Sequence, residues 1–354
     1  MIAKVVDTHY RSLPHMHFPI IKKYSLLFAG IAISTVVLNA TDKPFGHVPT
    51  TVSPMAQQIL KMKVPSSEQI VSIEQWQQVR KDFNAQSVVN NEKVKKQYTK
   101  KSEKVSIAGV PVLVVTPKNY ERKNDDTIAL YIHGGAYTLG NPEYLYSAFA
   151  PLAQQTGLKV YAIDYHLAPE HPFPAGLEDT LKVYKNLLKH FGAKKIVMFG
   201  DSAGGGLSLA TLLKAQSEGL DMPAALVLYS PWSDVDKVGD SYYTLENISP
   251  LLHYEKNLRS SAQAYAKDNS MKNPLISPVY AKYTKAFPPT LIQVGTRDLF
   301  LSNCVRLYRK MKKDGVNVQL SAWDGMWHVF EAVPELPEAK EAIMEASAFM
   351  KQYL

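Results

Sequence analysis

The sequence predicts an α/β fold in which a mainly parallel sheet lies between layers of helices. Short apolar segments typical of buried strands alternate with longer segments typical of helices. Strands joined through helices pair in parallel, because each helix returns the chain to the same edge of the sheet. Several polar motifs follow predicted strands, where such sheets bind ligands. The predicted strands are 109–116, 127–132, 159–163, 195–199, 224–229, 291–295 and 318–322, and the predicted helices include 175–188, 207–214 and 339–350.

Residues 200–204 read Gly-Asp-Ser-Ala-Gly, a Gly-x-Ser-x-Gly pattern centred on Ser202. The pattern stands between predicted strand 195–199 and predicted helix 207–214, which is the strand–turn–helix context of a nucleophile elbow. A serine on such a turn has a strained backbone and is presented to a substrate, and glycines flank it because a Cβ would clash there. We therefore predict that Ser202 is a nucleophile.

A serine of this kind requires an acid and then a histidine further along the chain. Asp298 follows predicted strand 291–295 and opens a helix-like segment, where Asp also serves as a helix N-cap. His328 follows predicted strand 318–322, and it is the one histidine of ten that comes after Asp298. We predict that His328 takes the proton of Ser202 and that Asp298 orients the imidazole.

A glycine-rich motif, His133-Gly134-Gly135-Ala136-Tyr137, follows predicted strand 127–132. Glycines at a strand end let backbone N–H groups approach a substrate carbonyl closely. Fixed N–H donors of this kind stabilise the charge that develops in a tetrahedral transition state. An ordinary glycine-rich turn is the alternative interpretation.

With these motifs, the chain resembles the hormone-sensitive-lipase-like branch of the α/β-hydrolases, which includes bacterial carboxylesterases and the arylacetamide deacetylases. The resemblance runs from about Val105 to the C-terminus. It implies an α/β-hydrolase fold with a helical cap. The segments that carry it are 133–137, 164–175, 200–205, 230–234 and 273–278, together with those around Asp298 and His328.

The resemblance also implies the oxyanion donors. They are backbone N–H groups of Gly134, Gly135 and Ala136 in some combination, together with that of Ala203. Ala136 stands where a third glycine is usual in the family, and its Cβ would narrow the acyl site. The family pattern gives Asp164 and Glu170 a structural role in bracing loops near the site, rather than a catalytic one.

The expected function is that of a serine carboxylesterase or lipase-like hydrolase, which cleaves short- to medium-chain carboxylic esters through an acyl-enzyme. Lactone hydrolysis is an alternative, since 323–328 is similar to a lactone-hydrolase subgroup, and aryl-amide deacetylation is another. A ligand-binding member without catalysis is a third. The apolar residues that either line the substrate pocket or belong to the core are Tyr137, Trp232, Phe300, Met326, Trp327 and Phe330.

Composition excludes several other classes of function. The net charge is +8, but no basic stripe interleaved with aromatic residues points to nucleic acid. We expect no cofactor and no metal, because neither a phosphate-binding loop nor a Cys/His cluster with ligand spacing is present. Cys304 is expected to be a small buried residue. The densest basic run is interpreted as a solvated helix face and linker, and it comprises Lys93, Lys95, Lys96, Lys100, Lys101 and Lys104.

The first 40 residues are expected to be a signal peptide or an N-terminal anchor. Lys22 and Lys23 precede the apolar segment 25–38, whose length of about 14 residues is below the roughly 20 that a spanning helix needs. Cleavage after Ala40 is expected, and Met16 is a candidate for the true start. The chain is therefore expected to be periplasmic, secreted or associated with a membrane through this segment.

Residues 41–104 are expected to form a helical cap segment, and residues 105–354 the catalytic domain. A helix is predicted to start at 66–68, after Pro65, and an apolar stripe follows it. We expect this segment, with part of 235–286, to cover Ser202. The alternative is a helix that packs on the sheet away from the site. The stripe consists of Ile73, Trp76, Val79 and Phe83.

Overall fold

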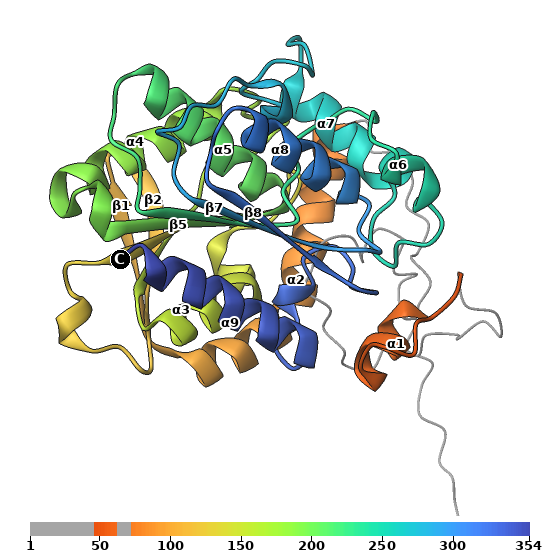
Figure 1. The fold of residues 1–354 in the computed structure, drawn as a ribbon, viewed down its shortest axis with the longest axis horizontal. Helices are drawn as coiled ribbons and strands as arrows, with labels where there is room; N and C mark the ends of the chain where they lie inside the picture. The colour runs from red at the N-terminus through yellow and green to blue at the C-terminus, as the bar shows by residue number, and fades with distance from the viewer. Residues whose placement is uncertain (1–45, 62–71) are drawn as a thin grey trace, which may run out of the picture.

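The computed structural model describes residues 46–61 and 72–354, which form an eight-stranded sheet between two layers of helices (Figure 1). The strands are β1 (Thr99–Ile107), β2 (Val110–Pro117), β3 (Ile128–Ile132), β4 (Lys159–Ile163), β5 (Ile196–Asp201), β6 (Ala225–Tyr229), β7 (Thr290–Gly295) and β8 (Val318–Trp323). The helices are α1 (Pro54–Leu60), α2 (Ile73–Tyr98), α3 (Tyr146–Thr156), α4 (Ala175–Phe191), α5 (Ser202–Ser217), α6 (Ser241–Thr244), α7 (Arg259–Ala266), α8 (Leu301–Lys313) and α9 (Pro337–Gln352).

The strand order is β1-β2-β4-β3-β5-β6-β7-β8. All pairs from β4 to β8 are parallel, whereas β2 is antiparallel to both of its neighbours. Helices α4, α5 and α8 cover one face, and α3 and α9 cover the other (Figure 1). Because both faces are covered, the central strands are apolar along their whole length. The α/β prediction with a mainly parallel sheet is confirmed, and each predicted strand overlaps one of β2 to β8.

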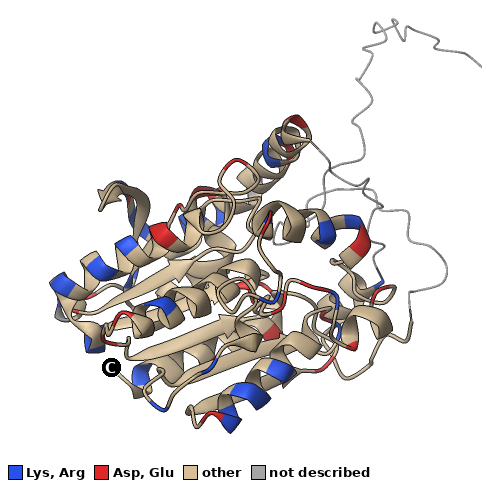
Figure 2. Cartoon of the chain, turned by 90° about the horizontal axis from the view of Figure 1, so that it is seen from above, with Lys and Arg blue, Asp and Glu red and all other residues tan. Residues whose placement is uncertain are grey.

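The prediction of a linker at the end of the basic run is wrong. Lys100, Lys101 and Lys104 lie on β1, an edge strand that pairs with β2, whereas Lys93, Lys95 and Lys96 lie on α2. No sequence pattern indicated β1, because the strand carries few apolar residues and shows no clear alternation. Its exposed lysines fit an edge position, since charges there discourage pairing with other chains. Figure 2 shows Lys and Arg spread over several outer helices with Asp and Glu between them.

Helix α2 begins at Ile73, with Ser72 and Gln75 forming a capping box. The predicted start at 66–68 lies outside the described residues, as do the predicted signal segment and its apolar core. Within the stripe, Trp76, Val79 and Phe83 are buried, whereas Ile73 is 46% exposed. Trp76 and Val79 cluster with Leu139, beyond the end of β3, while the C-terminal part of α2 packs along α3. The start of α2 thus lies beside the loop after β3 and the rest lies along α3, while its role as a cap over Ser202 stays a prediction.

The segment 46–60 packs against the loop that follows β8. Val52, Ile59 and Leu60 share a buried cluster with the start of α9 and with three residues of that loop, Met326, Trp327 and Phe330. Thr51 Oγ1 donates a hydrogen bond to Asp324 Oδ2, and the backbone N–H of Ser53 donates one to Glu338 Oε1. This segment therefore contacts the chain directly before His328.

None of the helices in the described ranges is long and apolar enough to cross a membrane.

A buried carboxyl group lies just after His328. Glu331 is 1% exposed, and neither of its side-chain oxygens has a hydrogen-bond partner among the described residues. Burial raises the pKa of Glu331 well above its ordinary value, and the nearby carboxylates of Asp298, Asp201 and Glu345 raise it further. The folded structure therefore favours the protonated form of the Glu331 carboxyl group over the charged form.

Gly325→Ala is expected to lower the free energy of unfolding by more than Gly219→Ala. Both glycines have positive φ, 67° and 71°, so both variants carry the left-handed backbone cost of roughly 1–2 kcal/mol. At Gly325 the added Cβ would also lie 2.8 Å from Val52 Cγ1 and 2.9 Å from Pro49 Cγ, whereas nothing lies within 4 Å at Gly219. Urea unfolding measures both losses, and equal losses would contradict the packing of segment 46–60 at this loop.

Glu331→Gln is expected to raise the melting temperature by an amount that grows with pH. The folded-state pKa of Glu331 is raised, so unfolding releases its proton, and wild-type stability falls as pH rises above the ordinary value of 4.5. The glutamine variant has no proton to release. Thermal melts from pH 4 to 8 should show a difference that is smallest at pH 4, while the exposed Glu341→Gln control shows none. A pH-independent difference would contradict a buried protonated Glu331.

Candidate active site

Ser202 occupies the turn between β5 and α5. It is the first residue of α5, has a φ of 53° and is only 2% exposed. The turn packs tightly against the end of β3: a Cβ at Gly204 would lie 2.1 Å from the Ile132 carbonyl oxygen and 2.4 Å from that of His133. Only glycine fits at that position. The serine therefore has the strained elbow conformation expected from the Gly-x-Ser-x-Gly pattern.

The structure brings Ser202, His328 and Asp298 together in one hydrogen-bonded series. His328 Nε2 lies 2.9 Å from Ser202 Oγ, and His328 Nδ1 lies 3.1 Å from both carboxylate oxygens of Asp298. Asp298 is fully buried, and its Oδ1 also accepts a hydrogen bond from the Phe300 N–H. A carboxylate facing Nδ1 keeps the proton on that nitrogen, which leaves Nε2 free to accept the serine proton.

Two contacts fix the orientation of the His328 imidazole. The ring of Phe300 packs edge-on against it, with ring centroids 4.8 Å apart. The next residue, Val329, has a φ of 50°, which is rare for a β-branched side chain, and its N–H donates a hydrogen bond to Ser230 Oγ. Ser230 begins the segment 230–234 that the sequence singled out, but its bond to the histidine loop had no sequence signal.

The proposed oxyanion donors divide into two groups. The Gly134 N–H donates a hydrogen bond to Asp201 Oδ1 at 3.1 Å, so this donor is already engaged. The N–H groups of Gly135, Ala136 and Ala203 have no acceptor among the described residues. Ala136 has a φ of 53°, a conformation that glycine adopts without strain. Of the four candidate donors, the geometry thus leaves Gly135, Ala136 and Ala203.

Asp201 is a structural residue of the site that the sequence analysis did not single out, although it lies within the elbow motif. Its carboxylate accepts hydrogen bonds from the Gly134 N–H and from Tyr131 Oη, the latter at 2.5 Å. Burial raises the pKa of Asp201. Asp201 therefore ties the serine turn to the glycine-rich turn through a buried carboxyl group.

His133 lies close to the site but is not a candidate base. Burial lowers its pKa to about 4, so the imidazole is neutral at neutral pH. Its ring stacks on Tyr165 with centroids 4.2 Å apart, and its Nδ1 lies 2.6 Å from the Gly134 carbonyl oxygen. Cys304 is also fully buried, and burial raises the pKa of its thiol, so it has no thiolate for nucleophilic attack. No cluster of His, Cys, Asp and Glu suited to a metal ion occurs in the described parts of the chain.

The six pocket candidates are all almost completely buried. Tyr137, Trp232 and Phe300 form a row of stacked rings in the main core, with neighbouring centroids 5.8 and 5.5 Å apart. Tyr265 of α7 extends the row by stacking on Tyr137 at 3.7 Å. The row links α7 to His328 through Phe300. Direct contact with a substrate remains a prediction for these residues and for Met326, Trp327 and Phe330, which pack against segment 46–60.

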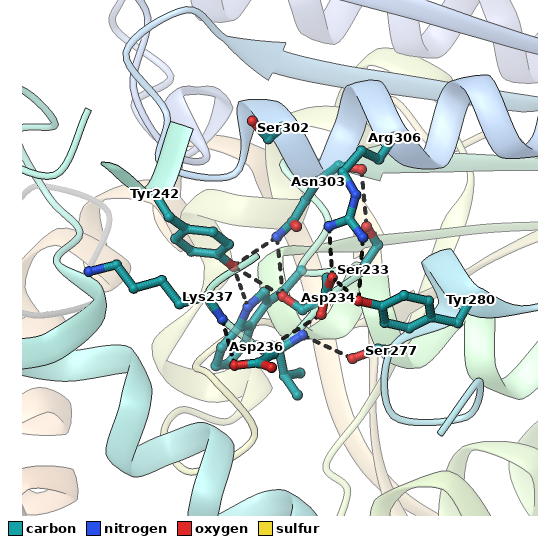
Figure 3. Close-up of polar contacts among 12 residues, drawn as sticks. Ser233, Asp234, Asp236, Lys237, Tyr242, Ser277, Tyr280, Ser302, Asn303 and Arg306 are labelled. Carbon is teal, nitrogen blue, oxygen red and sulfur yellow. Dashed lines mark hydrogen bonds and ion pairs between the residues drawn. The ribbon is translucent and has the colours of Figure 1, made fainter. Parts of the chain in front are cut away.

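A buried polar network holds the loop after β6 against the start of α8 (Figure 3). Asp234 Oδ2 accepts hydrogen bonds from Arg306 Nη1 at 2.7 Å and from Tyr280 Oη at 2.8 Å. Asn303 Nδ2 donates a hydrogen bond to Tyr242 Oη at 2.9 Å. Asp234 is fully buried, and the hydrogen bonds from these partners offset the cost of removing its carboxyl group from water.

The loop after β6 also contacts the backbone of the predicted nucleophile, Ser202. The Trp232 N–H donates a hydrogen bond to the Ser202 carbonyl oxygen at 2.8 Å, and α8 begins three residues after Asp298. The network therefore connects the segment bearing the serine with the segment bearing the acid. The sequence marked residues 230–234 as a motif but could not show their partners on α8.

Comparison with known proteins agrees with this geometry. A family model described as "alpha/beta hydrolase fold" matches residues 129–332. An acetyl-hydrolase of Streptomyces hygroscopicus is 36% identical over 231 residues, which are 65% of this chain and 77% of that protein. The crystal structure of an esterase E25 superposes with a TM-score of 0.81 at 32% identity, covering 87% of this chain and 96% of the esterase.

An esterase from the bacterial hormone-sensitive lipase family superposes with a TM-score of 0.75 at 31% identity, covering 85% of this chain and 98% of that esterase. The sequence motifs and the mainly parallel eight-stranded sheet agree with these matches. The chain belongs to the alpha/beta hydrolase fold family, in its hormone-sensitive-lipase-like branch.

Proposed function

We propose that this chain is a serine carboxylesterase that cleaves short- to medium-chain esters. The observation that carries the proposal is the hydrogen-bonded series from Asp298 through His328 to Ser202, beside backbone N–H groups that have no acceptor among the described residues. Such an arrangement supplies a nucleophile, a base and an oxyanion site together. The family membership and the names of the similar proteins, acetyl-hydrolase and esterase, support the same chemistry.

In the acylation step, Ser202 Oγ attacks the ester carbonyl carbon while His328 Nε2 takes the hydroxyl proton. The carbonyl oxygen becomes negatively charged and accepts hydrogen bonds from the N–H of Ala203 and from Gly135, Ala136 or both. Collapse of the intermediate expels the alcohol, which takes its proton from His328. Asp298 stabilises the imidazolium that forms between these two transfers.

In the deacylation step, a water molecule attacks the acyl-enzyme carbonyl and His328 Nε2 accepts its proton. The same N–H groups hold the second oxyanion. Ser202 then recovers its proton from His328 and the carboxylic acid leaves. The buried position of Asp298 keeps its charge directed at Nδ1 through both steps.

The cap is proposed to consist of the first turns of α2 and the segment 254–266. Tyr265 stacks on Tyr137 of the glycine-rich turn, and Thr138 Oγ1 lies 3.2 Å from Ser261 Oγ on α7. Segment 254–266 thus contacts Tyr137 and Thr138, which directly follow the oxyanion donors in the sequence. The first turns of α2 contact the next residue, Leu139. The preference for short acyl chains is supported by the acetyl-hydrolase relative and by the Cβ of Ala136 beside the donors.

Export, or attachment to a membrane, through the first 40 residues is also proposed. Its support is the sequence pattern of two lysines before an apolar segment.

Ser202→Ala is expected to abolish hydrolysis of p-nitrophenyl acetate and butyrate. The wild type should be most active on short chains in a series that runs to palmitate. Ser217→Ala, at the exposed end of the same helix, is the matched control and should keep full activity. Hydrolysis that survives in Ser202→Ala would exclude this serine as the nucleophile. An inactive but folded wild type would favour lactones, aryl amides or a binding role.

Asp298→Asn is expected to lower kcat by roughly 10⁴-fold with little change in KM, the size of effect that follows when the acid no longer holds the correct imidazole tautomer. Asp268→Asn, on an exposed loop, serves as the control and should behave as wild type. Steady-state kinetics on p-nitrophenyl butyrate measure the effect, with melting curves to establish that both variants are folded. A loss below tenfold would contradict the role of Asp298.

A further inference from the structure

An arginine of α2 contacts the site from outside the segment that the family model matches, which begins at residue 129. Arg80 Nε donates a hydrogen bond to the Thr138 carbonyl oxygen at 2.6 Å, and Nη2 donates one to the Ala168 carbonyl oxygen at 2.5 Å. Nη1 and Nη2 also bind the two carboxylate oxygens of Glu170, each at 2.7 Å. One planar guanidinium thus joins three separate acceptor groups.

One of these acceptors, Thr138, belongs to the turn that carries the oxyanion donors, and another, Ala168, belongs to a segment bonded to that turn. The Gly135 carbonyl oxygen accepts hydrogen bonds from the N–H groups of Thr138 and Leu139, which closes the turn. The Ala168 N–H donates a hydrogen bond to the Tyr137 carbonyl oxygen at 2.9 Å. Arg80 bonds to the carbonyl groups of Thr138 and Ala168, so it holds the two segments together on the side facing α2.

This turn needs support because its backbone is strained. Ala136 and Tyr137 have φ values of 53° and 64°, and neither is a glycine. Non-glycine residues in this region persist where the surrounding structure holds them. The N–H groups of Gly135 and Ala136 lie within this strained segment, so a shift of the turn would move the donors themselves.

The Arg80–Glu170 pair is well placed to supply that support. The two side chains are 19% and 27% exposed, so the pair is largely shielded from solvent. The hydrogen bonds from Arg80 lower the pKa of Glu170. Charge-assisted bidentate bonds are stronger and more directional than neutral ones. Trp76 and Val79 pack against Leu139 from the same helix, which fixes the origin of the arginine side chain.

We propose that Arg80 is a positioning residue that holds the oxyanion turn in its catalytic geometry from α2. The inference rests on the proposed esterase function. It extends the catalytic apparatus to a helix that precedes the family-matched segment. A lysine cannot take this role, because a single ammonium group cannot reach two backbone carbonyls and a carboxylate in the fixed geometry of the guanidinium.

The test compares Arg80→Gln, Arg80→Lys and Glu170→Gln with wild type in the full-length chain. Lys93→Gln is the matched control, since Lys93 forms an exposed ion pair with Glu335 from the same helix. Kinetics on p-nitrophenyl acetate and butyrate are normalised to active sites titrated with diethyl p-nitrophenyl phosphate. Melting curves establish the folded fraction of each variant at the assay temperature.

Arg80→Gln is expected to lower kcat about 10- to 100-fold with KM changed less than threefold, somewhat below the roughly 10²–10³-fold loss of a whole oxyanion donor. Arg80→Lys should not restore kcat. Glu170→Gln should lose less than Arg80→Gln, because the bonds to both carbonyls remain. Lys93→Gln should match wild type.

A second readout separates positioning from a general effect on substrate access. A trifluoromethyl ketone forms a serine adduct whose oxyanion lies where the transition-state charge develops. Its inhibition constant should rise in Arg80→Gln by about the same factor as kcat/KM falls. A rise in KM at unchanged kcat, with unchanged inhibition, would instead make α2 a substrate cap and overturn the proposal.

Folded Arg80 variants that retain wild-type kcat would also overturn the proposal. If Arg80→Gln does not fold, the kinetics of Arg80→Lys and Glu170→Gln provide the test instead. A wild type that hydrolyses none of the esters would refute the proposed function. Failure of the inference about Arg80 is therefore distinguishable from failure of the esterase assignment.

Discussion

The site depends on the close approach of the turn after β5 to the end of β3. At Gly204 the two backbones are so near that a single methyl group would overlap the carbonyl groups of β3. Asp201 reinforces this contact by accepting the Gly134 N–H, so the nucleophile turn and the oxyanion turn form one rigid unit. A serine hydrolase needs that rigidity, because preorganised donors stabilise charge without having to reorient during the reaction.

Asp298 and His328, the other two members of the hydrogen-bonded series, lie in loops of the neighbouring part of the sheet. Parallel pairing of β6, β7 and β8 brings their carboxyl ends to the same edge as that of β5, and the loops after β7 and β8 carry Asp298 and His328. Each loop has its own support. The network around Asp234 fixes the start of α8, and the packing of segment 46–60 covers the residues before His328.

Several ionisable groups near the site are buried at a cost to stability. Asp201 has hydrogen-bond donors to offset its burial, whereas Glu331 has none among the described residues, and burial raises its pKa well above the ordinary value. His133 is neutral for a related reason, since burial disfavours the imidazolium. The region around the histidine loop thus combines a strained backbone at Val329 with a buried acid, a pattern found where structure is constrained by function.

By itself, the sequence determined the fold class, most of the strands and the identities of Ser202, Asp298 and His328. These follow from local patterns: apolar segments of strand length, glycines where a backbone must approach closely, and the order of polar residues after strands. The sequence did not predict β1, because an edge strand with exposed lysines lacks the apolar alternation by which strands are found.

Only the tertiary structure decided which candidate oxyanion N–H group is already engaged, since Gly134 donates its hydrogen bond to a residue 67 positions away. The tertiary structure also decided which groups contact Arg80, Asp234 and segment 46–60, because these contacts join elements that are far apart in the sequence. Residues distant in the chain meet because the sheet and its helices bury apolar surface together, and no local pattern records which polar groups that burial brings within reach.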